Sequence, residues 1–182
     1  MHPYFLLSSR LGFGCWSPDD IDLARSLWGD SRVMEFIGGP LQKRDVEERL
    51  GREIATMASD HVQYWPIFRL SDDVHIGCCG LRPYDPAARV FELGVHIRPE
   101  HWGRGFACES ARIVMSHAFG MLGVRALFAG HHPQNHVSRH LMQKLGFRYT
   151  HDELYPPTGL RHPSYLITSE EHKIMSGSAR LS

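Results

Sequence analysis

Hydrophobic and polar residues alternate in several short stretches of the chain, while in other stretches the hydrophobic residues recur every three or four positions. Alternation is typical of strands with one buried face, and the longer period indicates amphipathic helices. The alternating and short apolar stretches predict seven strands, at residues 6–15, 62–70, 74–81, 91–97, 124–129, 147–155 and 161–168. Helical spacing predicts helices at residues 17–28, 31–37, 46–57, 107–118 and 134–145. This order of elements suits a mixed α+β fold in which helices pack on one sheet.

Local signals refine some of these boundaries. Ser17 and Asp20 have the spacing of a capping box, which favours the start of a helix at this point. Residues 82–88 are expected to form a loop that leads into the strand at 91–97. The Pro-Pro-Thr-Gly sequence at 156–159 indicates the turn of a closing hairpin.

The composition is that of a single globular domain. The chain has 182 residues, of which 42% are hydrophobic and 22% charged, so it can bury a core and is too hydrophobic to be disordered. We expect one domain over residues 1–170 and a polar tail over residues 171–182. Twenty basic and twenty acidic residues give a formal net charge of zero, which does not support a broad nucleic-acid or membrane-binding surface.

The four cysteines give no sign of a disulfide framework or a zinc site. Cys15, Cys78, Cys79 and Cys108 lack CxxC spacing, and the adjacent pair lies in an apolar stretch, so buried free thiols are expected. No apolar stretch reaches the roughly 20 residues that cross a bilayer, and the N-terminus lacks the apolar region of a signal peptide. We therefore expect a cytoplasmic protein.

The most informative segment is Phe91–Ala107, in which a strand leads through a glycine-containing turn into a helix. Such a turn at a helix N-terminus presents unpaired N–H groups and partial positive charge, which suits a phosphate or diphosphate group. Gly94 lies inside the strand, where a glycine is costly unless the backbone bulges or another group approaches closely.

Together with the segments that follow it, this motif resembles the GNAT family of acyl-CoA N-acyltransferases. Downstream lie a short apolar strand and a block typical of the family, namely Val124–Ala129, Asn135, Ser138 and Lys144–Phe147. Gly105 and Ala107 fill the last two positions of the family's diphosphate loop, whereas Trp102 stands where the family has Gln or Arg. The similarity is closest to the branch that includes ribosomal-protein N-terminal acetyltransferases. It implies a GNAT-like, seven-stranded sheet that splays between its fourth and fifth strands.

The resemblance implies acetyl-CoA as a co-substrate and assigns candidate residues to it. Main-chain groups at the splayed strand edge would pair with the pantetheine arm as an added strand does, and the residues concerned are Val95, His96 and Ile97. Main-chain N–H groups of the turn would bind the diphosphate, from Trp102, Gly103, Arg104, Gly105, Phe106 and Ala107. Asn135 is expected to cap the following helix, to hydrogen-bond the pantetheine arm, or both.

Three residues are candidates for proton transfer, two as the base and one as the acid. An amine must be unprotonated to attack a thioester, and Glu92 is the candidate base because partial burial would raise its pKa. His96 lies on the same face of the strand if no bulge intervenes, and it is the second candidate. In much of the family a Tyr protonates the leaving thiolate; Met142 occupies that position here, so Ser138 is the candidate acid by resemblance. The alternatives are an ion-paired or solvent-facing Glu92 and an ordinary helix serine.

The reaction implied is acetyl transfer to a primary amine, of a protein N-terminus or a small molecule, by direct attack. An inactive acyl-CoA-binding module is the main alternative. A nucleotide-binding protein that uses the glycine turn for ATP is a further alternative, although the chain lacks the Gly-Lys-Ser/Thr ending of a P-loop. Dimers are common in the family, so the resemblance is also compatible with a homodimer.

Histidines and aromatic residues offer less decisive signals. His132, His136 and His140 recur every four residues, but no acidic ligand or cysteine joins them locally, so we expect no metal ion. Four aromatic residues either line an acceptor pocket or simply pack, namely Trp28, Phe36, Tyr155 and Tyr165.

Overall fold

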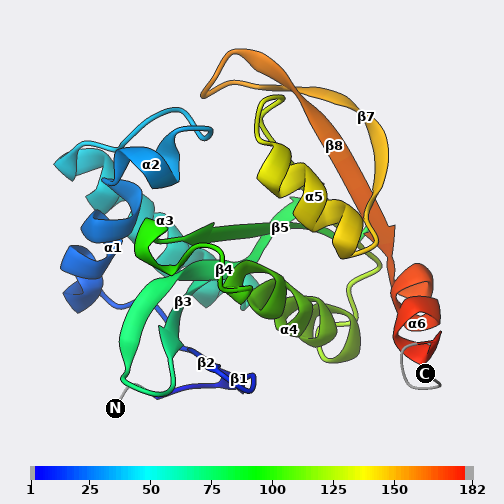
Figure 1. The fold of residues 1–182 in the computed structure, drawn as a ribbon, viewed down its shortest axis with the longest axis horizontal. Helices are drawn as coiled ribbons and strands as arrows, with labels where there is room; N and C mark the ends of the chain where they lie inside the picture. The colour runs from blue at the N-terminus through cyan, green and yellow to red at the C-terminus, as the bar shows by residue number, and fades with distance from the viewer. Residues whose placement is uncertain (1–2, 179–182) are drawn as a thin grey trace.

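One mixed sheet of eight strands runs through the protein, which a computed structural model describes over residues 3–178 (Figure 1). In sheet order the strands are β1 (Leu6–Leu7), β2 (Leu11–Phe13), β3 (Tyr64–Arg69), β4 (Val74–Asp85), β5 (Val90–Ile97), β6 (Ala126–Gly130), β8 (Leu160–Thr168) and β7 (Arg148–Tyr155). Neighbouring strands are antiparallel except β5 and β6, which run parallel. The predicted mixed α+β fold is therefore confirmed.

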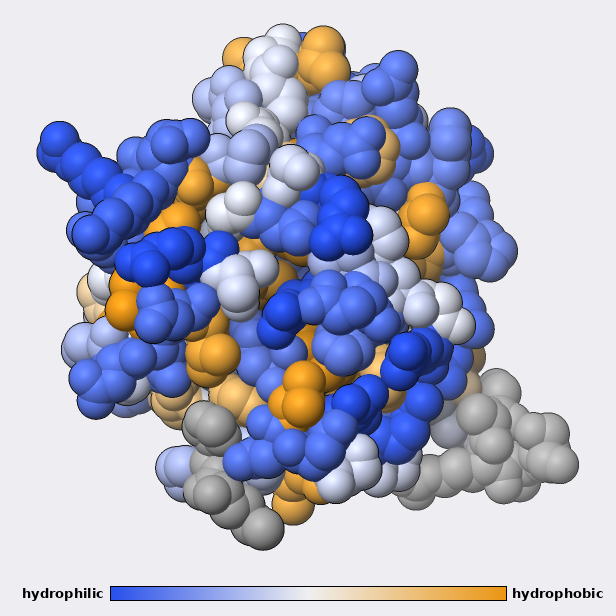
Figure 2. All heavy atoms as spheres, turned by 60° about the vertical axis from the view of Figure 1, so that its left-hand side comes forward, coloured by the Kyte–Doolittle hydropathy of each residue, from blue (hydrophilic) through white to orange (hydrophobic). Residues whose placement is uncertain are grey.

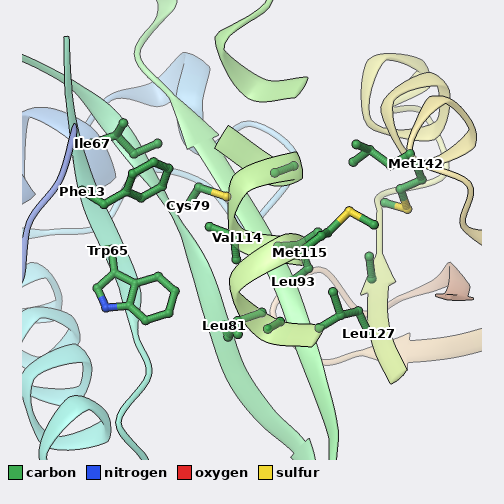
Figure 3. Close-up of a cluster of buried hydrophobic side chains, with 14 of the residues drawn as sticks. Phe13, Trp65, Ile67, Cys79, Leu81, Leu93, Val114, Met115, Leu127 and Met142 are labelled. Atoms are coloured by element: carbon green, nitrogen blue, oxygen red, sulfur yellow. The ribbon is translucent and has the colours of Figure 1, made fainter. Parts of the chain in front are cut away.

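Helices cover both faces of the sheet and bury a separate apolar cluster on each. The helices are α1 (Ile21–Trp28), α2 (Ser31–Met34), α3 (Lys43–Asp60), α4 (Phe106–Gly120), α5 (His136–Lys144) and α6 (Ser169–Ser178). The cluster in Figure 3 joins α4 and α5 to the sheet through residues such as Val114, Met115 and Met142. The second cluster joins α1, α2 and α3 to the other face. The capping box predicted at Ser17 is present, since the Ser17 N–H donates to the Asp20 carboxylate at 2.8 Å.

The sheet has eight strands because the first predicted strand is broken. Residues 6–15 were expected to form one strand, but Ser8 N–H donates to the Leu11 carbonyl at 2.9 Å and the Ser8 hydroxyl accepts from Leu11 N–H at 3.0 Å. Serine favours such local turns because its side chain hydrogen-bonds nearby backbone groups. The segment therefore folds back on itself as β1 and β2.

The predicted loop at residues 82–88 is also partly wrong. β4 continues to Asp85, so that Arg82 pairs with Glu92 and Pro83 with Phe91. The regular register holds through Pro83, and the register shift comes only between Pro83 and Asp85. As a result, the side chain of Arg82 is positioned beside Glu92.

β5 and β6 separate after a short paired region. Only Val90, Phe91 and Glu92 of β5 pair with β6. Within residues 3–178, the rest of β5 pairs with β4 on one side and with no strand on the other. The opening predicted between the fourth and fifth strands is confirmed at this point, where it exposes main-chain groups of β5.

The C-terminal segment forms α6 rather than extended chain. Thr168 and Glu171 cap this helix reciprocally: Glu171 N–H donates to the Thr168 hydroxyl at 3.3 Å, and Thr168 N–H donates to the Glu171 carboxylate at 2.9 Å. The His172 ring packs on Phe119 of α4, with ring centroids 4.8 Å apart. The proposed boundary between residues 170 and 171 stays a prediction, and residues 179–182 of the expected tail lie outside the described residues.

The surface is mainly polar on the face that Figure 2 shows, where hydrophobic residues are scattered among hydrophilic ones. None of the helices in the described part of the chain has the length and apolar character needed to cross a membrane.

Stability should fall at acidic pH because His75 on β4 is buried. Its ring lies against Trp16 and Phe68, and burial, reinforced by the charge of Arg98, lowers its pKa from 6.5 to about 4. A folded-state pKa below the unfolded one favours the neutral form, so this stability is present above pH 6.5 and is lost as the pH falls towards 4. Between pH 7 and pH 5 the expected loss from this group is about 2 kcal/mol.

Denaturant unfolding at pH 7 and pH 5 measures this loss. His75→Gln should show a smaller drop in unfolding free energy than the unchanged protein, whereas His140→Gln, on the exposed side of α5, should not. An equal drop in all three proteins would show that His75 does not carry the effect.

Candidate functional site

The turn between β5 and α4 exposes main-chain donors at a helix N-terminus. Gly103 and Gly105 have φ values of 71° and 79°, which only glycine adopts without strain. The first helical hydrogen bond runs from Glu109 N–H to the Gly105 carbonyl at 3.0 Å. The N–H groups of Phe106 and Ala107 precede that bond and have no intrahelical acceptor. This geometry suits an anionic group, as expected from the sequence.

Side chains of the same turn hold its two ends. The Trp102 indole N–H donates to the Ile97 carbonyl at 2.6 Å, although the side chain is otherwise half exposed. Phe106 is 4% exposed and belongs to the apolar cluster beneath α4. The turn is thus anchored to the end of β5 and to the core, while its backbone faces outwards.

An arginine from the distant β1–β2 turn braces this turn from outside. Both terminal nitrogens of Arg10 donate to the Arg104 carbonyl at 3.2 Å, and its Nε donates to the Glu109 carboxylate at 2.7 Å. Ser8 adds a hydrogen bond to Glu109 at 2.7 Å. Burial raises the pKa of Glu109, but the hydrogen bonds from Ser8 and Arg10 outweigh this effect and hold the pKa below its usual value. Sequence reasoning missed this contact because Arg10 lay within a predicted strand.

Tyr64 from β3 lies across Gly94 of β5. A Cβ placed on Gly94 would be 2.2 Å from Tyr64 Cζ. The β4–β5 register is regular here, with Gly80 opposite Gly94, so the glycine marks a close approach and not a bulge. The approaching group is a side chain of the protein itself. Glu92 and His96 consequently share one face of the strand, as predicted.

Glu92 is partly buried among charged and hydroxyl groups. Burial raises its pKa above the usual glutamate value, while Arg82, the Tyr64 hydroxyl and Arg49 partly offset this increase. Within residues 3–178 no arginine, lysine or histidine nitrogen lies within 4 Å of its carboxylate. The group is therefore a carboxylate with a raised pKa and without an ion-pair partner, which is an arrangement suited to a general base.

His96 is less suited to this role. Its Nδ1 accepts a hydrogen bond from the Trp28 indole N–H at 3.3 Å. Burial, followed by the charges of Arg49 and Arg82, lowers its pKa well below 6.5. His96 is thus a neutral, weakly basic ring whose δ nitrogen is already occupied.

The residues proposed on α5 follow directly after β6. The Asn135 side chain accepts a hydrogen bond from Ser138 N–H at 3.0 Å and so caps α5, which leaves its amide NH₂ group available. Ser138 is half-buried in the first turn, and its hydroxyl makes no hydrogen bond with the described residues. Met142 is buried in the core. The structure does not bring Ser138 into the cluster around Glu92, and its role stays a prediction.

The four aromatic residues considered for an acceptor pocket have different surroundings. Trp28 is fully buried against Arg49, with the guanidinium 4.6 Å from its ring. Burial, and then the charge of Glu92, raise the pKa of Tyr155 on β7. Phe36 packs on His132 at 5.1 Å. Tyr165 lines a separate cavity of about 380 Å³ between α5 and the β7–β8 hairpin.

The histidines at 132, 136 and 140 do not form a metal site in the structure. His132 instead lies between the rings of Phe36 and His162, at 5.1 and 5.5 Å. Across the part of the chain that is described, no three His, Cys, Asp or Glu side chains lie close enough to hold a metal ion.

Comparison with known proteins gives matches at the level of family and fold. The family model for the acetyltransferase (GNAT) domain matches residues 10–148. The chain is 25% identical to the uncharacterized N-acetyltransferase p20 of Bacillus licheniformis, over 79% of this chain and 82% of the relative. A GNAT-family acetyltransferase from Bacillus anthracis has a TM-score of 0.77 at 19% identity, over 91% of this chain and 98% of that one. RimL, a ribosomal L7/L12 α-N-protein acetyltransferase solved with coenzyme A, has a TM-score of 0.78 at 12% identity, over 91% and 98%. The two structures share the fold of this chain.

Proposed function

This chain belongs to the acetyltransferase (GNAT) domain family and is an N-acetyltransferase, and from that premise we propose that it transfers an acetyl group from acetyl-CoA to a primary amine by direct attack. The observation that carries the proposal is the separation of β5 from β6 directly after Glu92. It leaves a strand edge open beside a candidate base, and the same strand leads into the glycine turn of α4.

The residues around this opening fit acetyl-CoA. The outward-facing N–H groups of the turn, from Gly103 to Ala107, would hold the diphosphate. The Trp102 main-chain N–H, predicted from the sequence to be one of them, already donates to the Pro99 carbonyl at 3.1 Å. The open edge at Val95 and Ile97 would pair with the amide-bearing pantetheine arm, with the Ile97 carbonyl already engaged by Trp102. His96, between them, turns its main-chain groups towards β4 and does not contribute to this edge. The free amide NH₂ of Asn135 would add a hydrogen bond. When bound, acetyl-CoA supplies the thioester that the amine attacks.

Proton transfer would be shared between two side chains. Glu92 removes a proton from the ammonium group of the acceptor, directly or through water, and the amine then forms a bond to the thioester carbon. As the carbon–sulfur bond breaks, Ser138 or water protonates the thiolate and takes up in exchange the proton that the acceptor nitrogen loses in forming the amide. Burial raises the pKa of Cys78 to about 12, so this thiol is unsuited to a covalent acyl-enzyme.

The acceptor belongs to one of two classes, a protein N-terminus or a small-molecule amine. RimL, which shares the fold, is named for action on a ribosomal protein, and this motivates including N-terminal peptides among the acceptors tested. We also propose a cytoplasmic location and a homodimer, on family resemblance.

Release of free coenzyme A thiol, measured over a panel of N-terminal peptides, polyamines and amino acids, tests the function. Thiol release that requires an acceptor supports it. The alternative function considered from the sequence, an inactive acyl-CoA-binding module, rests on Met142 at the acid position and Trp102 in the loop. Calorimetric binding of acetyl-CoA without thiol release for any acceptor would support that alternative.

Arg10→Met should weaken coenzyme A binding by about fivefold, because loss of about 1 kcal/mol of hydrogen bonding lets the glycine turn relax. Calorimetry with coenzyme A measures the change. Arg25→Met removes an exposed ion pair on α1, to Asp22, and is the matched control. Equal affinity in both variants would show that Arg10 does not support the binding turn.

A further inference from the structure

A buried carboxylate on α3 organises the surroundings of Glu92. Glu53 is 1% exposed and forms an ion pair with Arg82 of β4. Its carboxylate also lies 3.5 Å from Arg49 Nε, one turn earlier on α3, and accepts a hydrogen bond from Tyr64 N–H at 2.8 Å. One carboxylate therefore holds two guanidinium groups and the backbone of β3.

Stability alone does not explain this cluster. Burying charges is expensive, and well-packed apolar side chains often serve a core as well or better. Arg49 is 7% exposed, and its Nε and Nη2 atoms have no hydrogen-bond partner within the described residues. A cluster that is incompletely satisfied and beside a candidate catalytic residue points to a functional role.

Each partner of Glu53 also faces Glu92. Arg82 occupies the position opposite Glu92 in the β4–β5 ladder, and its guanidinium stacks 4.3 Å above the Tyr64 ring. Tyr64 lies across Gly94 and favours the charged form of Glu92 through its hydroxyl. The charge of Arg49 also favours the ionised form of Glu92. Arg82 and Arg49 are thus two cations that act on Glu92, and Glu53 pairs with both of them.

We infer that Glu53 is a positioning residue that holds Arg82 and Arg49 and so leaves the carboxylate of Glu92 without an ion-pair partner and free to accept a proton. This inference depends on the proposed role of Glu92. Counting these two arginines, the titratable or charged groups around Glu92 come from β3, β4, α3, β7 and its own strand. They are Tyr64, Tyr84, Arg82, Arg49, Glu153, Tyr155 and His96.

Two substitutions should shift the titration of Glu92 in opposite directions. In Glu53→Gln the arginines are released to pair with Glu92, so its charged form is favoured and its titration moves to lower pH. In Arg82→Met a nearby positive charge is lost, so the titration moves to higher pH. Arg82 is one-third exposed, so this variant tests the proposal even where Glu53→Gln fails to fold.

Carbon-13 NMR of protein labelled at the glutamate carboxyl carbon measures this titration without any acceptor, and Glu92→Gln assigns the signal. The acidic limb of the kcat–pH profile should move in the same direction. Glu48→Gln, which breaks an exposed pair with Arg44 on the same helix, should leave Glu92 unchanged.

Opposite shifts in the two variants support the proposal. A Glu92 titration that stays at the wild-type pH in both folded variants would overturn it, as would shifts in the same direction. The NMR signal reports on Glu92 whether or not it is the base. Full activity of Glu92→Gln would therefore refute the proposed role of Glu92 as the base separately.

Discussion

Replacing Glu92 with glutamine should lower kcat by at least about 100-fold near neutral pH, the contribution expected of a general base. Glutamine keeps the shape of the side chain but cannot accept a proton. A base acts in its deprotonated form, so the rate of the unchanged enzyme should rise with pH through the pKa of Glu92. Burial places that pKa above the ordinary glutamate value. In Glu92→Gln this limb should disappear, and the deficit should shrink at high pH, where the amine is already unprotonated.

The measurement is kcat from pH 6 to pH 10 with a saturating acceptor identified in the thiol-release panel. Glu92→Asp keeps a carboxylate and is the matched control: it should retain part of the activity and an acidic limb. Unchanged rates and an unchanged pH profile in Glu92→Gln would exclude this residue as the base. His96 would then be the remaining candidate base.

The structure of the segment proposed to bind the co-substrate was largely predictable because that segment is continuous in sequence. A strand, two glycines and a helix N-terminus lie within Phe91–Ala107, and the structure places their main-chain groups as the pattern indicates. What could not be predicted was the support from outside this segment. Arg10 donates to the Arg104 carbonyl of the turn from the β1–β2 hairpin, and the apolar residues of that segment had predicted a single strand instead of a hairpin.

The surroundings of the candidate base were harder to predict because they combine four separate elements. Arg82 was assigned to a loop, but β4 continues in regular register through Pro83, and this continuation pairs Arg82 with Glu92. A signal for Glu53 and Arg49 did exist. Both interrupt the apolar side of the helix that carries Val46 and Leu50. Burying a charged side chain costs free energy, so charged residues at such positions indicate a role beyond packing.

Gly94→Ala should destabilise the protein by about 3 kcal/mol, at the upper end of the cost of overpacking a core. The new methyl group would lie 2.2 Å from Tyr64 Cζ. The ring has little freedom to move, because Tyr64 is 2% exposed, its N–H is held by Glu53, and Arg82 stacks on it. Displacing the ring also removes its hydroxyl from Glu92, so kcat per folded molecule should fall as well.

Denaturant unfolding gives the change in stability, and Gly51→Ala is the matched control. Gly51 lies within α3 with no atom within 4 Å of the added Cβ, so alanine there should stabilise the protein by roughly 0.5–1 kcal/mol. Adding Tyr64→Leu to Gly94→Ala should recover part of the lost stability, because neighbouring substitutions that relieve a shared clash are not additive. If Gly94→Ala were as stable as the unchanged protein, Tyr64 would not cover this strand. The glycine would then be available for approach by a ligand, which is the other reason for a glycine at this point of β5.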